Sequence, residues 1–361
     1  MKKYIFLFLF TFLGFSILES QTDTQYLDVD YVETAQSIKL KYEQNTMLLS
    51  PSKAGHMGLR LYRNYKDSKY KYLLLQGINY SSNSLDKLIS NGLDSISLNE
   101  YARRINKSYK PSTVKKSLRK ATLKKYPYYR IYAAKMLRSV ARLDELGIEH
   151  NQHDDFMKAL RSYDFRKVFE DSIMIKAWGA QLANQVYWLN QLEINDYRSE
   201  FRKAVKETYP HTMDSQLSDQ QFENKIYTLT HIIIAASEYY RYKVSYDEYA
   251  DIIEYFRSNK NQILNRCKED VIIEVGLSLL LVNENYPEII DIKNYIMGRV
   301  CPQNEVIPSV KGNSDLSLGE HRNIIAVLLL DWKGCSIMPS KNEVKTLKTH
   351  IPKSISIVDE E

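Results

Sequence analysis

The sequence predicts an all-α protein built from antiparallel helical hairpins, arranged as a double-layered α/α-toroid or solenoid. Glycine and proline are scarce for a chain of 361 residues, with 12 and 9 copies, and this favours helices over a turn-rich β fold. No long segment alternates apolar and polar residues with the period of a strand. In the second half, stretches that are apolar on every helical face alternate with amphipathic ones, as expected if inner helices are buried and outer helices half exposed.

The first half contains helical segments that are separated by proline residues and polar breaks. They are expected, in order, at 29–48, from Pro51, at 70–78, 85–89 and 97–108, from Pro111, and at 128–146 after Pro127. Proline suits the first turn of a helix, because its fixed φ is helical and its missing N–H is not needed there. In the first of these segments, apolar residues recur at helical spacing from Val32 to Tyr42.

The second half gives the clearer pattern. Inner helices are expected at about 172–192, 219–240, 270–282 and 319–332, and outer helices at about 196–207, 246–257 and 287–298. Capping boxes are expected at Ser218 with Gln221, Ser245 with Glu248, and Ser317 with Glu320. Because the connections are short, consecutive helices should be antiparallel, and the inner helices should therefore be parallel to one another.

The two ends of the chain are set apart from this domain. Residues 1–20 are predicted to be a secretory signal peptide, because Lys2 and Lys3 precede an apolar run from Tyr4 to Leu18 that is short for a membrane span. A retained N-terminal anchor is the alternative. Residues 21–340 are expected to form one helical domain, and residues 341–361 a C-terminal tail rich in lysine and serine. Export implies a periplasmic or secreted protein with no membrane span after cleavage.

Three cysteines leave two arrangements open. In an oxidising compartment, Cys301 and Cys335 can pair and close a loop that contributes roughly 3–4 kcal/mol. Alternatively, these two and Cys267 are all free and buried, as cysteine often is.

A basic segment at 101–143 interrupts the charge balance of the chain. It contains 14 of the 50 lysine and arginine residues, six interleaved tyrosines, and no aspartate or glutamate. Such a face suits an anionic partner, and behind a signal peptide we expect an acidic glycan or an envelope lipid rather than nucleic acid. The predicted ligand-binding residues are Lys115, Lys116, Lys120, Lys124 and Lys125, with Trp178 and Asn184 of the 172–192 helix. The alternative is a solvated face that complements the acidic remainder of the molecule.

A second group of candidate residues follows from the parallel inner helices, whose N-termini should gather at one end. The predicted catalytic residues are His231, Asp270, Glu274, His321 and Asn323. Asp270 and Glu274 are four residues apart and share a helix face. Two carboxylates in an apolar setting raise one pKa, which suits acid–base work with a histidine. His231 lies about three turns into its helix, so it reaches the others only if that helix is shifted.

Each member of this group also has a structural interpretation. Asp270 can complement a helix N-terminus, Glu274 can form a buried ion pair with Arg322 or a lysine, and His231 can be a satisfied core histidine. Cys267 with Asp270, His231 and His321 offers acceptable zinc ligands, but their spacing matches no compact motif, and HExxH and CxxC are absent. No phosphate loop or GxSxG elbow occurs either. We therefore predict neither a metal nor a cofactor.

Four short stretches resemble a bacterial family of exported proteins that is classed only as a domain of unknown function. They are Leu229–His231, Asp270–Gly276, Glu320–Asn323 and Asp331–Trp332. The resemblance covers most of the chain after the signal and implies an α/α-toroid-like fold without an assigned activity. In outline the family is similar to helical toroids that act on polysaccharides or isoprenoid-type substrates, but no catalytic motif of those enzymes matches here.

Two functions remain open at this point. The first is an enzyme that acts on an acidic glycan or cell-envelope polymer through the histidine–carboxylate group. The second is a non-enzymatic envelope-binding or scaffold protein that uses the basic, tyrosine-rich face.

Overall fold

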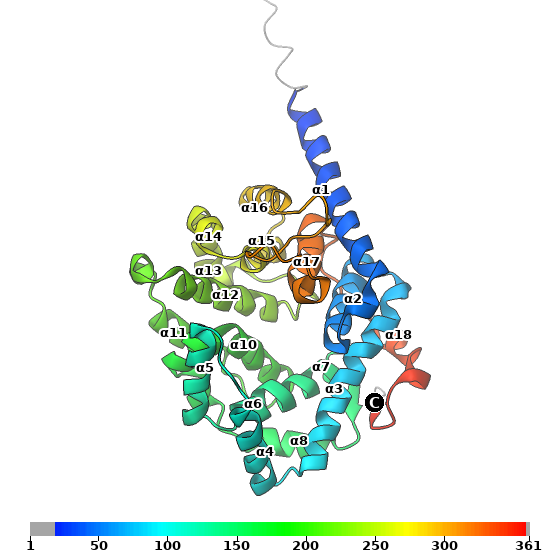
Figure 1. Ribbon diagram of the computed structural model, residues 1–361, viewed down its shortest axis with the longest axis vertical. Helices are drawn as coiled ribbons and strands as arrows, with labels where there is room; N and C mark the ends of the chain where they lie inside the picture. Colours follow the sequence, from blue (N-terminus) through cyan, green and yellow to red (C-terminus); the bar gives the residue numbers. More distant parts are fainter. Residues whose placement is uncertain (1–18, 359–361) are drawn as a thin grey trace, which may run out of the picture.

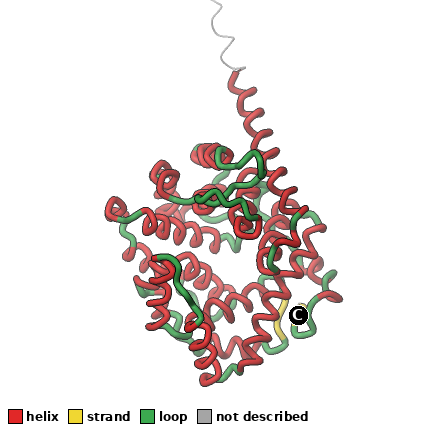
Figure 2. The backbone as a smooth tube through the Cα atoms, viewed as in Figure 1, coloured by secondary structure: helices red, strands yellow, loops and turns green. Residues whose placement is uncertain are grey.

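The computed structural model describes residues 19–358 and confirms the all-α prediction (Figures 1 and 2). The longer helices are α1 Glu19–Gln44, α2 Pro51–Tyr65, α3 Lys71–Asn91, α4 Ser95–Lys107, α5 Val114–Lys125, α7 Arg138–Asp144, α8 His153–Arg161, α10 Ser172–Gln191, α11 Arg198–Thr208, α12 Asp219–Ala236, α13 Tyr246–Ser258, α14 Lys260–Arg266, α15 Glu269–Val282, α16 Glu288–Met297 and α17 Leu316–Leu330. The shorter elements are α6 Tyr129–Ile131, the π-helical turn η3 Tyr132–Leu137, α9 Arg166–Phe169, α18 Lys341–Lys345 and the strands β1 Ile148–His150 and β2 Ile355–Ile357.

The inner helices form a ring that closes on itself. α10, α12, α15 and α17 pack side by side in this order, as the sequence predicted, and α17 packs on α2. α2 packs on α3, α3 packs on α7, and α7 contacts α10. Outer helices lie behind this layer, with α11 on α10, α16 on α15 and α1 on α17 (Figure 1). Helices from the two halves of the chain therefore surround one common interior.

Two helix crossings are close enough to require glycine. A Cβ atom on Gly55 of α2 would lie 2.4 Å from the Cα atom of Gly77 in α3. A Cβ atom on Gly179 of α10 would lie 2.1 Å from Oγ1 of Thr228 in α12. Real Cβ atoms do not approach other atoms so closely, so both pairs of helices depend on the missing side chain.

Both ends of the chain extend the helical domain beyond the predicted pattern. β2 pairs with β1 in antiparallel register, with Ile357 opposite Ile148 and Ile355 opposite His150. Residues from the predicted tail, 341–361, thus join the fold through α18 and β2. Of the predicted signal peptide, 1–20, residues 1–18 lie outside the described part of the chain. Within residues 19–358, no helix combines the length and hydrophobicity needed to cross a bilayer.

The cysteines and the helix N-caps test four further predictions. Cys267, Cys301 and Cys335 are all free. The capping box of Ser218 with Gln221 is confirmed at the start of α12. The boxes expected at Ser245 and Ser317 are wrong. Ser245 is an N-cap without a side-chain bond, and Asp315, not Ser317, caps α17 by accepting from Leu318 N–H.

A strained turn ends α12 at Ala236, four residues before the predicted end. Glu238, Tyr239 and Tyr240 have φ angles of 49°, 57° and 76°. This left-handed conformation costs a residue with a side chain about 1–2 kcal/mol. The turn is held because the Tyr239 carbonyl accepts from Arg63 Nη1–H at 3.0 Å and the Tyr240 carbonyl from Ser336 N–H at 3.0 Å. Its two tyrosine rings are buried against the interior.

We expect Glu238→Gly to relieve part of this strain. Glu238 is exposed and, among the described residues, its carboxylate accepts from Arg241 Nη1–H alone, so Glu238→Ala removes the same bond and serves as the control. The free energy of unfolding in urea should be about 1 kcal/mol higher for the glycine variant than for the alanine variant. Equal stability of the two variants would contradict a strained turn.

Candidate active site

Glu274, in the second turn of α15, joins three inner helices through its carboxylate. Its Oε2 accepts from Thr230 Oγ1–H of α12 at 2.7 Å. Its Oε1 lies 3.5 Å from His231 Nε2 of α12 and 3.2 Å from His321 Nε2 of α17. The structure thus brings together three of the five predicted catalytic residues around one carboxylate.

His231 reaches Glu274 because α12 starts early. It is residue 13 of α12, whereas Glu274 and His321 are each residue 6 of their helices. At 1.5 Å per residue, α12 begins about 10 Å before its neighbours, which supplies the shift that the sequence required. His231 Nδ1 lies 2.9 Å from Oδ1 of Asn184 in α10, and the centre of its ring lies 4.6 Å from that of Tyr227 with the two rings perpendicular. Asn184, predicted as a ligand-binding residue, therefore orients His231.

Two residues that the sequence did not indicate as catalytic extend this group. His321 Nδ1 lies 3.2 Å from His56 Nε2 of α2, and His56 Nδ1 lies 2.6 Å from Oε1 of Glu320. The side chains of His321 and His56 are 36% and 21% exposed, whereas those of Glu274 and Glu320 are 2% and 3% exposed. We call Glu274, His321, His56 and Glu320 the relay: two buried carboxyls with two accessible imidazoles between them.

The Glu274 end of the relay is an ion pair. Burial would raise the pKa of Glu274, but the charges of His231 and His321 and the hydrogen bond from His321 bring it down to about 2. Burial lowers the pKa of His321, but its hydrogen bond to Glu274 and the charge of that carboxylate raise it overall. Glu274 is therefore an anion at neutral pH, and it favours the imidazolium form of His321.

The Glu320 end has the opposite character. Burial raises the pKa of Glu320 to about 7, although the charges of His321, Arg60 and Lys53 act against the shift. Burial, together with Arg60 and His321, holds the pKa of His56 well below its ordinary value. His56 is therefore neutral, and Glu320 exchanges its proton near neutral pH.

The other two predicted catalytic residues make no contact with the relay. Asp270 is one turn before Glu274 and makes no hydrogen bond or ion pair with any described side chain, although its charge contributes to the raised pKa of His321. Asn323 serves a loop: its Oδ1 accepts from Ile307 N–H at 2.7 Å, and its Nδ2 donates to the Gly319 carbonyl at 3.1 Å. Asn323 thus holds the segment before α17 in place instead of facing the imidazoles.

The predicted basic residues of α5 divide between two faces. Lys115 points inward, with Nζ 5.4 Å from the centre of the Tyr227 ring, and burial lowers its pKa to about 8. Lys116, Lys120 and Lys124 are exposed on the outside. Lys125 pairs with Asp171 at 2.6 Å, at the N-cap of α10.

Trp178, also predicted as a ligand-binding residue, lies beside α5. Its indole N–H donates to Thr122 Oγ1 at 2.9 Å, and the Arg119 guanidinium lies 4.3 Å from its ring. Arg119 in turn donates to the Ala177 carbonyl. These contacts fix α5 on α10 and leave the tryptophan 8% exposed.

One sequence signal pointed to His56 and was missed. In helix α2, Gly55 and Gly58 flank the pair His56–Met57. Glycine is unfavourable in a helix interior, so two of them this close indicate a special site. Both glycines lie against α3, where added Cβ atoms would approach to 2.4 Å. Glu320 was assigned to a capping box with Ser317, but its carboxyl faces His56 instead.

Comparison with known proteins adds a family but no activity. The sequence model of DUF3541, described as a domain of unknown function, matches residues 31–357. No curated protein and no solved structure matches the chain. Among the described residues, no group of three or more histidine, cysteine, aspartate or glutamate side chains is arranged to hold a metal ion.

The raised pKa of Glu320 has a consequence for stability. An acid whose pKa is higher in the folded than in the unfolded state stabilises the fold at low pH, and this contribution is lost as the pH rises from about 4.5 to about 7. Glu320→Gln does not titrate. We therefore expect its free energy of unfolding to gain on that of the wild type by up to roughly 3 kcal/mol between pH 5 and pH 8.

Urea denaturation at the two pH values measures this difference. Glu207→Gln is the control, because the side chain of Glu207 is 67% exposed on α11. If the Glu320→Gln difference is the same at both pH values, Glu320 is ionised throughout and the relay has no proton to move.

Proposed function

The chain belongs to the DUF3541 family, and from the site we propose that it is an enzyme performing general acid–base catalysis on an acidic glycan or a related cell-envelope polymer. The observation that carries this proposal is the relay, in which two imidazoles that water can reach are backed by two buried carboxyls. A histidine core built only for stability gains nothing from exposed rings, whereas an acid–base site requires them.

In this proposal His321 is the base. Its Nε2–H donates to Glu274, which fixes the tautomer and leaves Nδ1 to accept a proton. The carboxylate then stabilises the imidazolium that forms, because the two charges meet in a buried setting. Thr230 and His231 hold Glu274 from the other side, so the carboxylate cannot turn away.

His56 is the acid. When Glu320 is protonated, its O–H donates to His56 Nδ1, and His56 then carries its own proton on Nε2, facing His321. A substrate that displaces the contact between His321 Nδ1 and His56 Nε2 meets an acceptor at His321 and a donor at His56. His56 gives the Nε2 proton to the leaving oxygen and takes the Glu320 proton at Nδ1.

The relay returns to its starting state without outside help. After one turnover, His321 holds the substrate proton and Glu320 has lost its own. Transfer from His321 Nδ1 to His56 Nε2, and from His56 Nδ1 to Glu320, restores every proton. One proton removed and one delivered is the balance of β-elimination at a uronate: the C5–H proton goes to the base, C4=C5 forms, and the oxygen on C4 leaves with the acid proton.

The substrate class follows from charge and location. Lys115 and Arg119 point inward from α5, beside Tyr227 and Trp178, so cations and aromatic rings lie near the interior. We also infer export to the periplasm or medium of a bacterium, from Lys2, Lys3 and the apolar run after them. Acidic glycans and envelope polymers are the anionic macromolecules expected there.

The enzyme proposal predicts a loss of turnover when either imidazole is removed. His321→Ala and His56→Ala should each lower kcat/KM by about 10²–10⁴-fold, since each removes a proton-transfer group. Glu274→Gln should act in the same direction by leaving His321 without its anion. The measurement is a panel of uronate-containing polysaccharides, followed by ultraviolet absorbance of the new double bond and by release of reducing ends.

His153→Ala is the control, because His153, the first residue of α8, makes a partly exposed contact with Glu149 of β1 and lies outside the relay. All variants are compared at equal thermal stability. Full activity of His321→Ala and His56→Ala would remove the relay from catalysis, and a panel that no preparation cleaves would count against the enzyme.

A second candidate function rests on the outer face of α5. Lys116, Lys120 and Lys124 are exposed at intervals of four residues, so they lie along one side of the helix. Lys120 and Lys124 make no ion pair with any residue from 19 to 358. A surface of this kind binds anionic polymers or lipids without any chemistry.

The binding function predicts that charge reversal abolishes association. Lys120→Glu with Lys124→Glu should lower binding to vesicles with anionic lipids and to acidic glycans, and added salt should do the same in the wild type. The same change at the exposed Lys158 and Lys311 is the control. Salt-insensitive binding that survives the reversal would exclude this face.

A further inference from the structure

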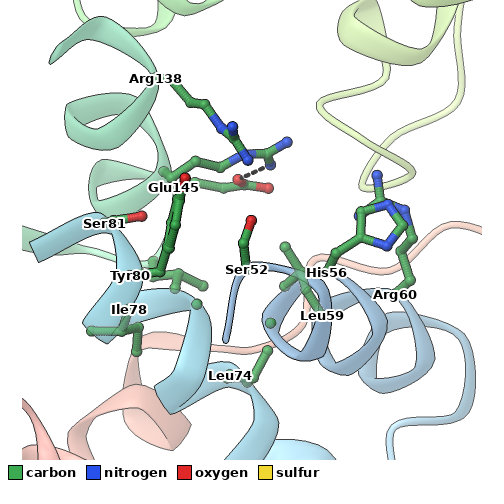
Figure 3. Close-up of a pocket in the computed structure, with 14 residues that line it drawn as sticks. Ser52, His56, Leu59, Arg60, Leu74, Ile78, Tyr80, Ser81, Arg138 and Glu145 are labelled. Atoms are coloured by element: carbon green, nitrogen blue, oxygen red, sulfur yellow. Dashed lines mark hydrogen bonds and ion pairs between the residues drawn. The ribbon is translucent and has the colours of Figure 1, made fainter. Parts of the chain in front are cut away.

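A cavity next to the relay is lined by arginines. It has a volume of about 90 Å³ and lies among α2, α3 and α7, with Arg60, Arg138, Arg142, His56, Tyr80 and Glu145 in its wall. Figure 3 shows Arg138, Tyr80 and Glu145 on one side and His56 and Arg60 on the other. His56 also contacts Glu320 and His321, so the cavity and the relay share this residue.

The positive charge of this cavity is not balanced by protein. Glu145 is its one carboxylate, and both oxygens are already engaged: Oε1 by Arg63 Nη2 at 2.6 Å and Oε2 by Arg142 Nη1 at 2.7 Å. Those two arginines bring the pKa of Glu145 down to about 2 in spite of its burial. Arg60 and Arg138 make no ion pair with any described residue, so their charges have no anion beside them.

Arg60 gives the stronger indication of an anion site, because it is the more deeply buried of the two arginines. It is 6% exposed, and its Nε–H is buried without a hydrogen-bond partner among the described residues. Its guanidinium lies 5.9 Å from the ring centres of both Tyr239 and Tyr240. The hydroxyl of Tyr239 is likewise buried and without a partner among residues 19–358. A buried donor without an acceptor is costly, and an anion in the cavity is the kind of ligand that satisfies Arg60.

Arg138 offers its charge from the opposite wall. It is exposed to the cavity, and its guanidinium lies 5.8 Å from the centre of the Tyr80 ring, which is itself 42% exposed. Such an aromatic face beside a cation suits the apolar face of a sugar ring and its acidic group.

Two backbone irregularities converge on this cavity. The π-helical turn η3 directly precedes Arg138, and such turns are frequent at functional sites. The left-handed turn at Glu238–Tyr240 sets the two tyrosine rings beside Arg60, and Arg142 lies 4.1 Å from the Tyr239 ring. Strain of this kind persists where the surrounding structure enforces it, and it concentrates at binding sites.

We propose that Arg60, Arg138 and Arg142 form a subsite for the acidic group of the substrate glycan, a carboxylate or a sulfate, with Tyr80 beneath the sugar ring. This inference rests on the proposed function, because it treats the cavity as the place where that substrate is anchored. Guanidinium groups match the planar oxyanion of a uronate by paired hydrogen bonds. A carboxylate neutralised there is next to His56 and His321, and neutralisation acidifies the C–H bond that an elimination must break.

The test measures binding without turnover. Sodium glucuronate and glucosamine 6-sulfate are titrated into the full chain by calorimetry, with glucose as the neutral probe and sodium chloride to match ionic strength. We expect the charged probes to bind and glucose not to bind. Arg138→Ala should weaken binding about tenfold or more, since a hydrogen bond to a charged group is lost, and Arg138→Lys should restore part of it.

Two control variants separate this subsite from a general effect of positive charge and from the proposed turnover. Arg103→Ala removes the same charge from an exposed position on α4 and should bind as the wild type does. His321→Ala should also keep full binding, because His321 does not line the cavity. If the wild type binds the charged probes but cleaves no polysaccharide, the proposed enzyme is disproved and the subsite is not. Which charged probe binds more tightly distinguishes carboxylate from sulfate. Equal binding of glucose, wild-type binding by Arg138→Ala, or no binding of either charged probe overturns the proposal.

Discussion

A single ionised carboxylate in the interior constrains the whole site. Glu274 is 1% exposed, so its charge is separated from bulk water and must be stabilised by protein. Thr230, His231 and His321 do this from two neighbouring helices, at fixed positions along each. A one-residue rotation of α12 or α17 would remove one of these partners, and removing a partner from a buried charge costs about 3–5 kcal/mol. The carboxylate therefore fixes how the three inner helices face one another.

The pKa values of the two carboxyls in the relay are shifted in opposite directions. At one end, two histidines keep Glu274 ionised; at the other, burial keeps Glu320 partly protonated. His321 and His56 lie between these two carboxyls. The pKa of His321 is raised and that of His56 is lowered, so an added proton resides on His321 rather than on His56. The two carboxyls differ in pKa because their neighbours differ. Glu274 lies against two imidazoles and a hydroxyl, whereas Glu320 contacts one imidazole and lies near Arg60.

The sequence predicts the helices that surround the site better than the site itself. Apolar periodicity predicts α10, α12, α15 and α17 in order, because a helix that is buried on all sides has apolar residues on all its faces. Glu274 was also identifiable, since an acidic residue among isoleucine, valine and leucine must have a partner. His56 was not identifiable. It lies in the first half of the chain, and only the packing of α17 on α2 brings it to Glu320 and His321, more than 200 positions away. Arg138 and Arg142 do belong to the predicted basic segment, but its composition did not single them out.

Local rules also failed where tertiary contacts were stronger. Ser317 and Glu320 have the spacing of a capping box, yet Asp315 caps the helix and Glu320 turns to His56. The segment 219–240 was predicted as one uninterrupted helix, yet three left-handed residues follow its end at Ala236, and no glycine in the sequence marks them. Asn323 has the residue type of a catalytic amide but serves the backbone of Ile307. Each case depends on a partner that is distant in sequence, which spacing alone does not reveal.

The pairing of β2 with β1 has a consequence for how the molecule is made. A ribosome releases β1 and α2 long before it releases their partners, β2 and α17. The nascent chain must therefore wait with one face of α2 and one edge of β1 uncovered, and such non-local contacts form slowly. The ring becomes complete only when α17 has left the exit tunnel and packs on α2, so the relay, which joins residues of these two helices to α15, forms late in synthesis.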